Sequence, residues 1–298
     1  MKTLLILIKR NTKIFFKDRG MFFTSLITPA ILLVLYTTFL KGVYKDTFIS
    51  NLPEGITFAE NIIDSLVASQ LISSILAVSC VTVAFCSNFL MVMDKYNGTV
   101  KDLTIAPVRP SVLASGYYVA NLISTLIICY VAYGISMGYV MLIGSYITLS
   151  DAICLFLDVT LLALFGASLS SVINFFLSTQ GQISAVGTII SAGYGFLCGA
   201  YMPISSFGDG LQKVLLFSPG TYGTALVRTH SLNGVLTELE KSGVPSDVVT
   251  SFRDALDCNL YIFGESVSTS VMYLILGGTV SLLVIAYILL NVFKKSKA

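Results

Sequence analysis

The sequence predicts an all-α integral membrane protein, and three observations support this fold class. Hydrophobic residues make up 55% of the 298 residues and charged residues only 11%, whereas soluble domains carry about 25% charged residues. Between residues 110 and 208 the only charges are Asp151 and Asp158. Three further stretches carry no charge: 21–40, 65–93 and 266–293. A water-soluble fold cannot cover that much apolar surface, so the bilayer must do so.

The charge-poor runs offer six candidate transmembrane spans. A bilayer core of about 30 Å needs roughly 20 helical residues. The predicted spans are 21–40, 66–93, 113–143, 152–177, 183–202 and 268–293. We expect one six-span membrane domain, 21–298, because charged or Gly/Pro-rich breaks separate most of these runs. The weakest break is 178–182, which is polar but uncharged.

Lysine and arginine are distributed unevenly over the predicted loops. Basic residues gather on the cytoplasmic side of membrane proteins, and six spans place both termini on one side. The short loop after the first span holds only Lys41 and Lys45, and the charges of the long 204–265 segment count little. The predicted inner side holds Lys2, Lys9, Arg10, Lys13, Lys17, Arg19, Lys95, Lys101, Arg109, Lys294, Lys295 and Lys297. We therefore expect a multi-pass protein of the cell membrane with both termini in the cytoplasm.

Residues 1–20 form an amphipathic pattern. On a helical wheel, five basic residues fall within one arc and most of the apolar residues cover the other side. The basic residues are Lys2, Lys9, Arg10, Lys13 and Lys17. This pattern predicts a cytoplasmic helix lying in the membrane interface, with its apolar face at the acyl boundary. It either docks a cytoplasmic subunit or only follows the bias of basic residues toward the cytoplasm.

Several kinds of catalytic chemistry are excluded by composition. The chain has no Gly-Lys pair, so it lacks the phosphate-binding loop G-x-x-x-x-G-K-[ST]. His230 is the only histidine, which excludes multi-histidine metal sites; we expect it in a solvated outer loop. The six cysteines form no C-x-x-C pair. We expect no enzyme, no metal site and no cofactor in this chain, and the net charge of +2 gives no reason to expect nucleic-acid binding.

The segment 94–110, between the second and third spans, predicts a short cytoplasmic helix. Gly98 can break the helix that leaves the membrane, and Thr99 can cap a new one. Pro107 and Pro110 end it, because proline cannot continue a helix. Such an element can pass force between a soluble motor and the membrane. The alternative is an ordinary connecting loop.

The stretch 193–228 has a second unusual pattern. Gly195 and Gly199 form G-x-x-x-G, which allows close helix approach. The apolar pieces 211–217 and 221–227 are each too short to span a bilayer and too apolar for free loops. We expect two half-helices that re-enter the outer leaflet between spans five and six. The alternative is a surface cap packed on the bundle.

These two regions together resemble the membrane subunit of type-2 ABC exporters, a bacterial permease family that exports drugs, antibiotics and polysaccharides. The family's coupling helix between spans two and three is matched by Asp94, Gly98, Thr99 and Pro107, whereas Tyr96 and Asn97 depart from its charged pattern. The family's segment after span five is matched by Gly199, Pro203, 211–217, Pro219 and Arg228. The opening 10–36, with Pro29 inside the first span, is also similar.

The resemblance implies a permease worked by partners. Two soluble ABC ATPase subunits would bind ATP and Mg²⁺, and a second permease chain, identical or related, would complete a path lined by spans one, two and five. Those spans carry no charge, which favours an amphipathic or lipid-like substrate such as a drug, antibiotic, peptide or glycolipid. The coupling set implied is Asp94, Tyr96, Asn97, Gly98, Thr99, Leu103 and Pro107. The outer-gate set is Gly195, Gly199, Pro203, Pro219 and Arg228.

Two features leave other interpretations open. Asp158 lies about six residues into the fourth span, where a charge costs at most about 3 kcal/mol; it is either structurally paired or part of a proton relay. Residues 203–266 form the outer re-entrant and extracellular segment, in which Ser246–Leu256 predicts an exposed helix, either a solvated decoration or a cap on the outer gate. The alternative functions are a self-powered secondary transporter or channel, and a non-transporting membrane sensor subunit.

Overall fold

A computed structural model describes residues 2–42, 45, 60–105, 108–144, 146–262 and 264–295, and these residues are almost entirely helical. The all-α fold class is therefore confirmed. A single hairpin joins β1 (Tyr261–Ile262) to β2 (Glu265–Ser266), which pair antiparallel. The helices are α1 (Lys2–Lys17), α2 (Arg19–Leu35) with the π-helix η1 (Tyr36–Leu40), α4 (Glu60–Tyr96), α5 (Thr99–Ile105), α6 (Pro110–Ile143), α7 (Leu149–Phe176), α8 (Gln180–Leu197), the 3₁₀ helix η2 (Ile204–Ser206), α9 (Asp209–Leu216), α10 (Pro219–Lys241), α11 (Ser246–Ala255) and α12 (Thr269–Lys295).

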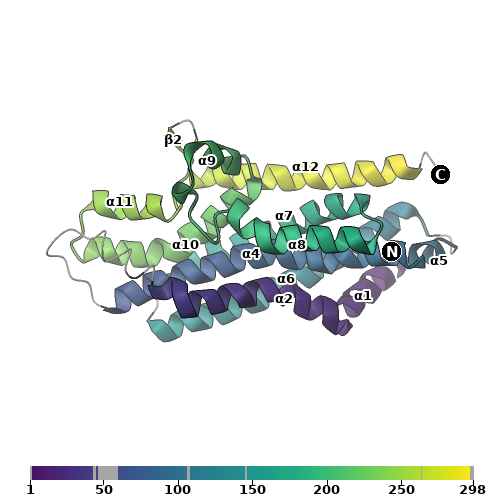
Figure 1. Cartoon of the computed structure of the whole chain (residues 1–298), viewed down its shortest axis with the longest axis horizontal. Helices are drawn as coiled ribbons and strands as arrows, with labels where there is room; N and C mark the ends of the chain where they lie inside the picture. The colour runs from purple at the N-terminus through teal and green to yellow at the C-terminus, as the bar shows by residue number, and fades with distance from the viewer. Residues whose placement is uncertain are drawn as a thin grey trace.

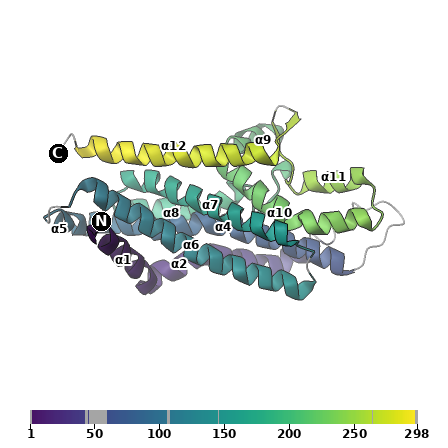
Figure 2. The same cartoon turned by 180° about the vertical axis from the view of Figure 1, so that it is seen from behind.

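Most of the long helices run side by side along one axis, as Figures 1 and 2 show from opposite sides. Helix α4 lies at the centre, with α2, α6, α7, α8 and α10 packed around it. Of the apolar stretch of α4 that could cross a membrane, 94% is buried inside the protein, whereas only 17% of the corresponding stretch of α12 is buried. The main core lies where α4 meets α7, α10 and α12, with Leu76, Val81, Leu162, Leu226 and Leu276 fully or almost fully enclosed.

Among the described residues, four helices are long and apolar enough to cross a bilayer: α4, α6, α7 and α12. The pair α1 and α2, bent by 69° at their junction, makes a fifth if it is counted as one span. The expected fifth span corresponds to α8, which has 18 residues and so measures about 27 Å. The six-span count stays a prediction.

The two ends of the bundle differ. At one end, here called the α5 end, lie both termini, α1 and α5 (Figure 1). At the other, the α11 end, α11, the last half of α10 and the start of α4 extend beyond the first residue of α12 (Figures 1 and 2). A second, smaller core fills this projection and includes Leu66, Leu71, Leu236, Val249 and Phe252.

The segment after α8 differs from the sequence prediction. Helix α9 has eight residues, but α10 continues for 23 residues to Lys241 instead of ending near Val227. The reason is an apolar stripe in its second half, Leu232, Val235, Leu236 and Leu239, which is buried against the start of α4. The expectation of two short half-helices was therefore wrong for the second one.

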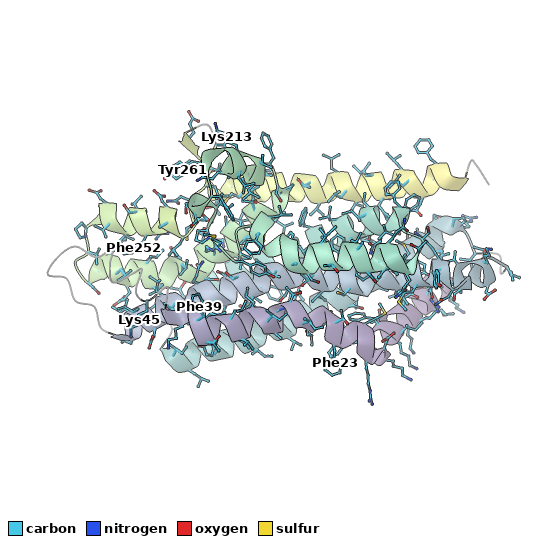
Figure 3. All side chains as sticks on the ribbon, viewed as in Figure 1. Phe23, Phe39, Lys45, Lys213, Phe252 and Tyr261 are labelled. Carbon is cyan, nitrogen blue, oxygen red and sulfur yellow. The ribbon has the colours of Figure 1, made fainter. Side chains whose placement is uncertain are left out.

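Helix α11 is found where the sequence predicted it, but it is not a solvated decoration. Val249 is fully buried, and Phe252 is 6% exposed. Figure 3 shows Phe252 on the side of α11 that faces α10. The polar composition of α11 concealed this, because only two of its ten residues, Val249 and Phe252, are buried.

Helix α1 also packs differently from the prediction. Its most buried residues, Leu7, Asn11 and Phe15, face the protein and not lipid. Leu7 fits against Gly116 of α6, where an added Cβ atom would lie 3.0 Å from the Leu7 Cβ. Leu5 of the apolar face stays exposed, and so does Ile6, the one apolar residue on the basic face. The amphipathic pattern therefore marks a helix packed on the bundle at the α5 end.

Candidate functional site

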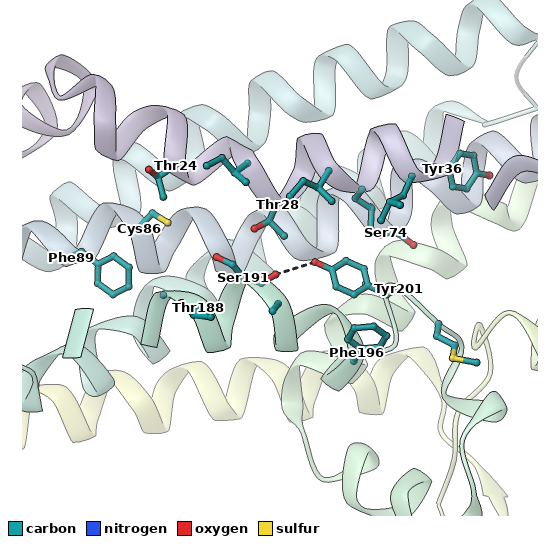
Figure 4. A pocket seen from close by; sticks show the side chains of 18 of the residues that line it. Thr24, Thr28, Tyr36, Ser74, Cys86, Phe89, Thr188, Ser191, Phe196 and Tyr201 are labelled. Carbon is teal, nitrogen blue, oxygen red and sulfur yellow. Dashed lines mark hydrogen bonds between the residues drawn. The ribbon is translucent and has the colours of Figure 1, made fainter. Parts of the chain in front are cut away.

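A cavity of about 1520 Å³ opens between α2 and α8, with α4 behind it. Figure 4 shows side chains from all three helices pointing into this space. Helix α2 contributes Thr24 and Thr28, α8 contributes Thr188 and Ser191, and α4 contributes Phe89 among others. The walls therefore come from the first, second and fifth of the predicted spans.

The lining of the cavity is apolar with a stripe of hydroxyl groups. Among the described lining residues, Asp18 is the only one with a formal charge, and it lies at the junction of α1 and α2. Its carboxylate also caps α2 by accepting a hydrogen bond from the Met21 amide at 3.1 Å. Apolar walls with a few polar groups suit an uncharged or amphipathic molecule. The serine and threonine hydroxyls are those of Thr24, Thr28, Ser74, Ser184, Thr188, Ser191, Ser205 and Ser206, and Tyr36 and Tyr201 also line the cavity.

Two irregularities shape the α2 wall. Pro29 lies inside the helix, where it removes a backbone hydrogen bond. The last turn, Tyr36–Leu40, widens to a π-helix, a form that is frequent at functional sites. Tyr36 anchors this turn by donating a hydrogen bond to the Val67 carbonyl of α4. Tyr36 thus attaches α2 to α4 at a point after Pro29, where α2 lacks a backbone hydrogen bond.

The cavity ends at the α11 end in a cluster of aromatic side chains. The hydroxyl of Tyr201 donates to the Ser191 carbonyl at 3.3 Å (Figure 4), and its ring meets Phe196 edge to face. The Tyr201 ring lies directly on Gly195, where any Cβ atom would overlap it. The G-x-x-x-G pattern was therefore misinterpreted, because Gly195 admits a tyrosine ring and Gly199 lies beyond the end of α8.

Arg228 holds this closed end together. It is 1% exposed and donates to the carbonyls of Gly199, at 2.8 Å, and Leu256, at 3.0 Å. It also pairs with Asp257 at 3.2 Å. Asp257 in turn accepts hydrogen bonds from the amides of Ile204 and Ser205. Burial raises the pKa of Asp257, although the positive charge of Arg228 opposes this.

The predicted outer-gate residues are partly gathered by this arrangement. Gly195, Gly199 and Arg228 meet at the closed end, and Pro203 lines the cavity beside them. Gly199 has φ +74°, and a Cβ atom there would lie 2.9 Å from Ile204. Pro219 is the first residue of α10, and the two residues that follow it, Gly220 and Thr221, contact Tyr194 and Leu197 of α8. The contribution of Asp257 was not predicted, since a loop aspartate 29 residues from Arg228 gives no local signal.

The predicted helix after α4 is confirmed. Helix α4 ends at Tyr96, Gly98 turns the chain with φ +79°, and α5 follows from Thr99. The cap position falls on Gly98 and not on Thr99, since the Gly98 carbonyl accepts from the Lys101 amide at 2.8 Å. Tyr96 and Asn97 are exposed, whereas Leu103 packs toward the bundle. Pro107 lies outside the described residues.

Asp94 faces inward just before α5. Its carboxylate pairs with Arg10 of α1 at 2.8 Å and accepts from the Tyr117 hydroxyl of α6 at 2.6 Å. Only 8% of the Asp94 side chain is exposed. The carboxylate therefore links α1, α4 and α6 at the base of α5.

Lys95, the next residue, makes a second link that the sequence did not reveal. Its ammonium donates to the carbonyls of Asn174, Phe175 and Leu177 at 2.9–3.2 Å. These carbonyls close α7, where a positive charge is favourable because of the helix dipole. A lysine in a predicted cytoplasmic loop is ordinarily interpreted only as evidence for the orientation of the protein in the membrane. The sequence therefore contains no sign that Lys95 binds the end of a helix.

Asp158 lies within α7, away from the cavity, and is bonded to His230 of α10 and Tyr273 of α12. The expectation that His230 is solvated was wrong, because its side chain is only 14% exposed. Polar residues beside it in the sequence suggested a loop, but they lie on the other faces of α10.

Comparison with protein families gives a match over residues 2–230, to the family described as ABC-2 type transporter. None of the curated proteins matches the chain. The matched range includes α1, α5 and the helices α2, α4 and α8 that wall most of the cavity. Helix α11, which adds Phe252 and Ala255 to the lining, and helix α12 lie outside it.

Proposed function

The chain belongs to the ABC-2 type transporter family and is a membrane component of an ABC transporter; from that premise we propose that it is the permease half of an ATP-driven exporter. The observation that carries the proposal is the juxtaposition of a charge-poor cavity with an exposed helix, α5, both attached to α4.

The cavity supports an amphipathic or lipid-like substrate. Its lining offers hydroxyl groups and aromatic rings but, among the described residues, only Asp18 as a formal charge. A small ion would need several charged or coordinating groups. A drug, antibiotic, peptide or glycolipid with few charges fits this chemistry, and a cavity of about 1520 Å³ exceeds the ordinary range of small-molecule pockets.

Helix α5 supports a separate motor. Lys101, Asp102 and Ile105 are exposed, and α5 buries none of its residues completely. Two soluble ABC ATPase subunits would bind ATP and Mg²⁺ and dock on α5 beside the basic face of α1. Closure of the ATPase pair would move α5, and the links made by Asp94 and Lys95 would pass that motion to α1, α6 and α7. The inward- and outward-facing states would then exchange population.

A second permease chain, identical or related, would complete the path. The cavity is bordered by α2 and α8 (Figure 4). Both helices carry exposed apolar residues there: Ile27 and Ile31 of α2 line the cavity, and Ile189 of α8 follows the lining residue Thr188. We place the assembly in the cell membrane with the α5 end in the cytoplasm, as the distribution of Lys and Arg indicates.

The test uses the double variant Lys101→Ala/Asp102→Ala, purified with its ATPase and inserted into lipid vesicles. We expect at least tenfold lower permease-dependent ATP turnover and loss of co-purification, because the docking surface is removed. Thermal unfolding should stay within about 0.5 kcal/mol of the unaltered protein, since both side chains are exposed. The matched control is Asp247→Ala, exposed on α11 at the opposite end. Unchanged turnover in the α5 variant, or uphill transport by the chain without any ATPase, would refute the proposal.

A second candidate, a self-powered secondary transporter, draws support from Asp158. This buried acid has a histidine and a tyrosine as partners, and intramembrane acids mark proton relays in such transporters. If that function is correct, collapsing the pH gradient across the vesicles stops transport, and omitting ATP does not.

A further inference from the structure

Three helices converge on one carboxylate at the α11 end of the membrane bundle. Asp158 projects from α7, and its Oδ2 lies 2.5 Å from Nδ1 of His230 on α10. Its Oδ1 accepts a hydrogen bond from the hydroxyl of Tyr273 on α12. Both oxygens are thus engaged by different helices, and neither partner lines the cavity described above.

The burial of this group requires a compensating positive charge or a proton. The Asp158 side chain is fully enclosed, and His230 is its only basic partner in the described part of the chain. An isolated ionised carboxylate is strongly disfavoured in such surroundings. A pair that holds one proton is neutral overall, whether the proton is on the imidazole or on the carboxylate.

The surroundings of His230 favour retention of that proton. Burial alone lowers the pKa of His230, but the hydrogen bond with Asp158 and the charges of Asp158 and Asp151 outweigh it, so its pKa is raised. The side-chain amide of Asn233 on α10 donates a hydrogen bond to the Asp151 carboxylate at 2.9 Å. The titratable groups that face the site are Asp151, Cys154 and Asp158 of α7 and Tyr273 of α12.

The other charged groups on elements packed against α10 are engaged or distant. Arg228, on α10 itself, is bonded to Asp257 and two backbone carbonyls. Three further sets of charged side chains make no bond to His230 in the part of the chain that the structure describes. They are Asp64, Asp94 and Lys95 of α4, Lys213 of α9, and Asp247, Arg253 and Asp254 of α11.

We propose that Asp158, His230 and Tyr273 form a buried proton-binding site that ties α10 to α7 and α12. The bound proton bridges Asp158 and His230, and Tyr273 fixes the carboxylate by its hydrogen bond. When the proton leaves to solvent past the partly exposed imidazole, an uncompensated carboxylate remains and the tie weakens. Helix α10 carries the projecting core at the α11 end, so the proton occupancy controls how firmly that projection is held.

The sign of the pH dependence follows from the raised pKa of His230. Protonation of His230 stabilises the fold fully below the ordinary histidine value, about 6.5. That contribution is lost as the pH rises through the higher value of the folded protein. The proposed tie is therefore firm below about pH 6.5 and weakens as the pH rises through the raised pKa of His230.

The decisive experiment exploits the fact that the chain contains a single histidine. The full chain is labelled with ¹⁵N-histidine, purified by a tag without histidine and placed in lipid bilayers, so that its NMR spectrum contains one imidazole. We expect the titration midpoint above 6.5 and, in Asp158→Asn, a midpoint at or below 6.5, because the hydrogen bond and the negative charge that raise it are removed. Asp247→Asn is the matched control, since it removes one negative charge from an exposed position on α11 outside the site, and its midpoint should stay above 6.5.

Two outcomes would overturn the proposal. The first is a midpoint at or below 6.5 in the unaltered protein, which can be read even if Asp158→Asn does not fold. The second is an unchanged midpoint in Asp158→Asn. Neither outcome depends on ATP or on an ATPase, so the result is independent of the proposed transport function.

Discussion

Gly195 is the residue on which the closed end of the cavity depends most directly. The ring of Tyr201 occupies the space where any other residue would carry its Cβ atom. Gly193, two residues earlier on α8, has open space at the same position. The two glycines therefore form a natural pair for testing the contact.

We expect Gly195→Ala to displace Tyr201 and to lower the free energy of unfolding by about 1–3 kcal/mol, as overpacking does. Gly193→Ala should be neutral or slightly stabilising, because alanine favours a helix by about 0.5–1 kcal/mol. Thermal unfolding of both variants in lipid nanodiscs measures the difference. Equal melting temperatures would contradict the contact between Gly195 and Tyr201.

The ion pair between Arg10 and Asp94 gives a second prediction for single residues. Arg10→Gln leaves the nearly buried Asp94 with Tyr117 as a partner but without a compensating charge. Breaking a fully buried pair costs about 3–5 kcal/mol, and the partial exposure of Arg10 reduces this to roughly 1–3 kcal/mol. Lys9→Gln, at the neighbouring exposed position, should change the unfolding free energy by less than about 0.5 kcal/mol. Thermal unfolding of the two variants tests this; the same loss in both would assign the effect to overall charge.

Among the elements, those defined by local signals were predictable from the sequence. The break at Gly98 and the helix that follows it were expected, because glycine and proline fix backbone geometry within a few residues. Helix α11 was placed correctly for the same reason. Contacts between distant segments left no such trace: Arg228 with Asp257, Lys95 with the end of α7, and His230 with Asp158 all join residues that the chain brings together only on folding.

Helices α10 and α11 also show where average composition misleads. The last half of α10 is polar overall, yet a narrow stripe buries it against α4. The apolar stripe of α1 was interpreted as a lipid-facing surface although it packs on α6. Periodicity shows which side of a helix is buried, but the identity of the buried partner requires the folded chain.

At this scale we predict that α11 is a stabilising element of the projection. Phe252→Ala should lower the unfolding free energy by about 3–5 kcal/mol, the usual cost of removing a buried phenylalanine. Ser251→Ala, at the adjacent exposed position, should be almost neutral. Differential thermal unfolding of the two variants decides the matter, and comparable stability would mean that α11 is loosely attached.

For the whole molecule, the proposed two-chain assembly predicts which face meets the second permease chain. Ile189 on α8 and Leu282 on α12 are exposed to similar extents, 63% and 70%, but α8 lines the cavity, with Thr188 next to Ile189, whereas α12 contributes none of the described lining residues. The native cysteines are buried except the half-buried Cys154, so their background reactivity should be low. We expect Ile189→Cys to form a cross-linked dimer in membranes and Leu282→Cys to remain mostly monomeric.

Cross-linking is measured by gel mobility after oxidation, with reduction as the control. Dimers through Leu282→Cys alone would move the interface to α12. Dimers through neither position would favour a chain that works with a different partner or alone.

The unequal lengths of α4 and α12 have a practical consequence for imaging. With 37 residues against 27, α4 is longer by roughly 15 Å, so the rigid projection at the α11 end should stand clear of lipid or detergent. A 32.1 kDa membrane protein ordinarily gives electron microscopists little contrast by which to orient a particle. An antibody fragment raised against the exposed face of this projection would supply that landmark.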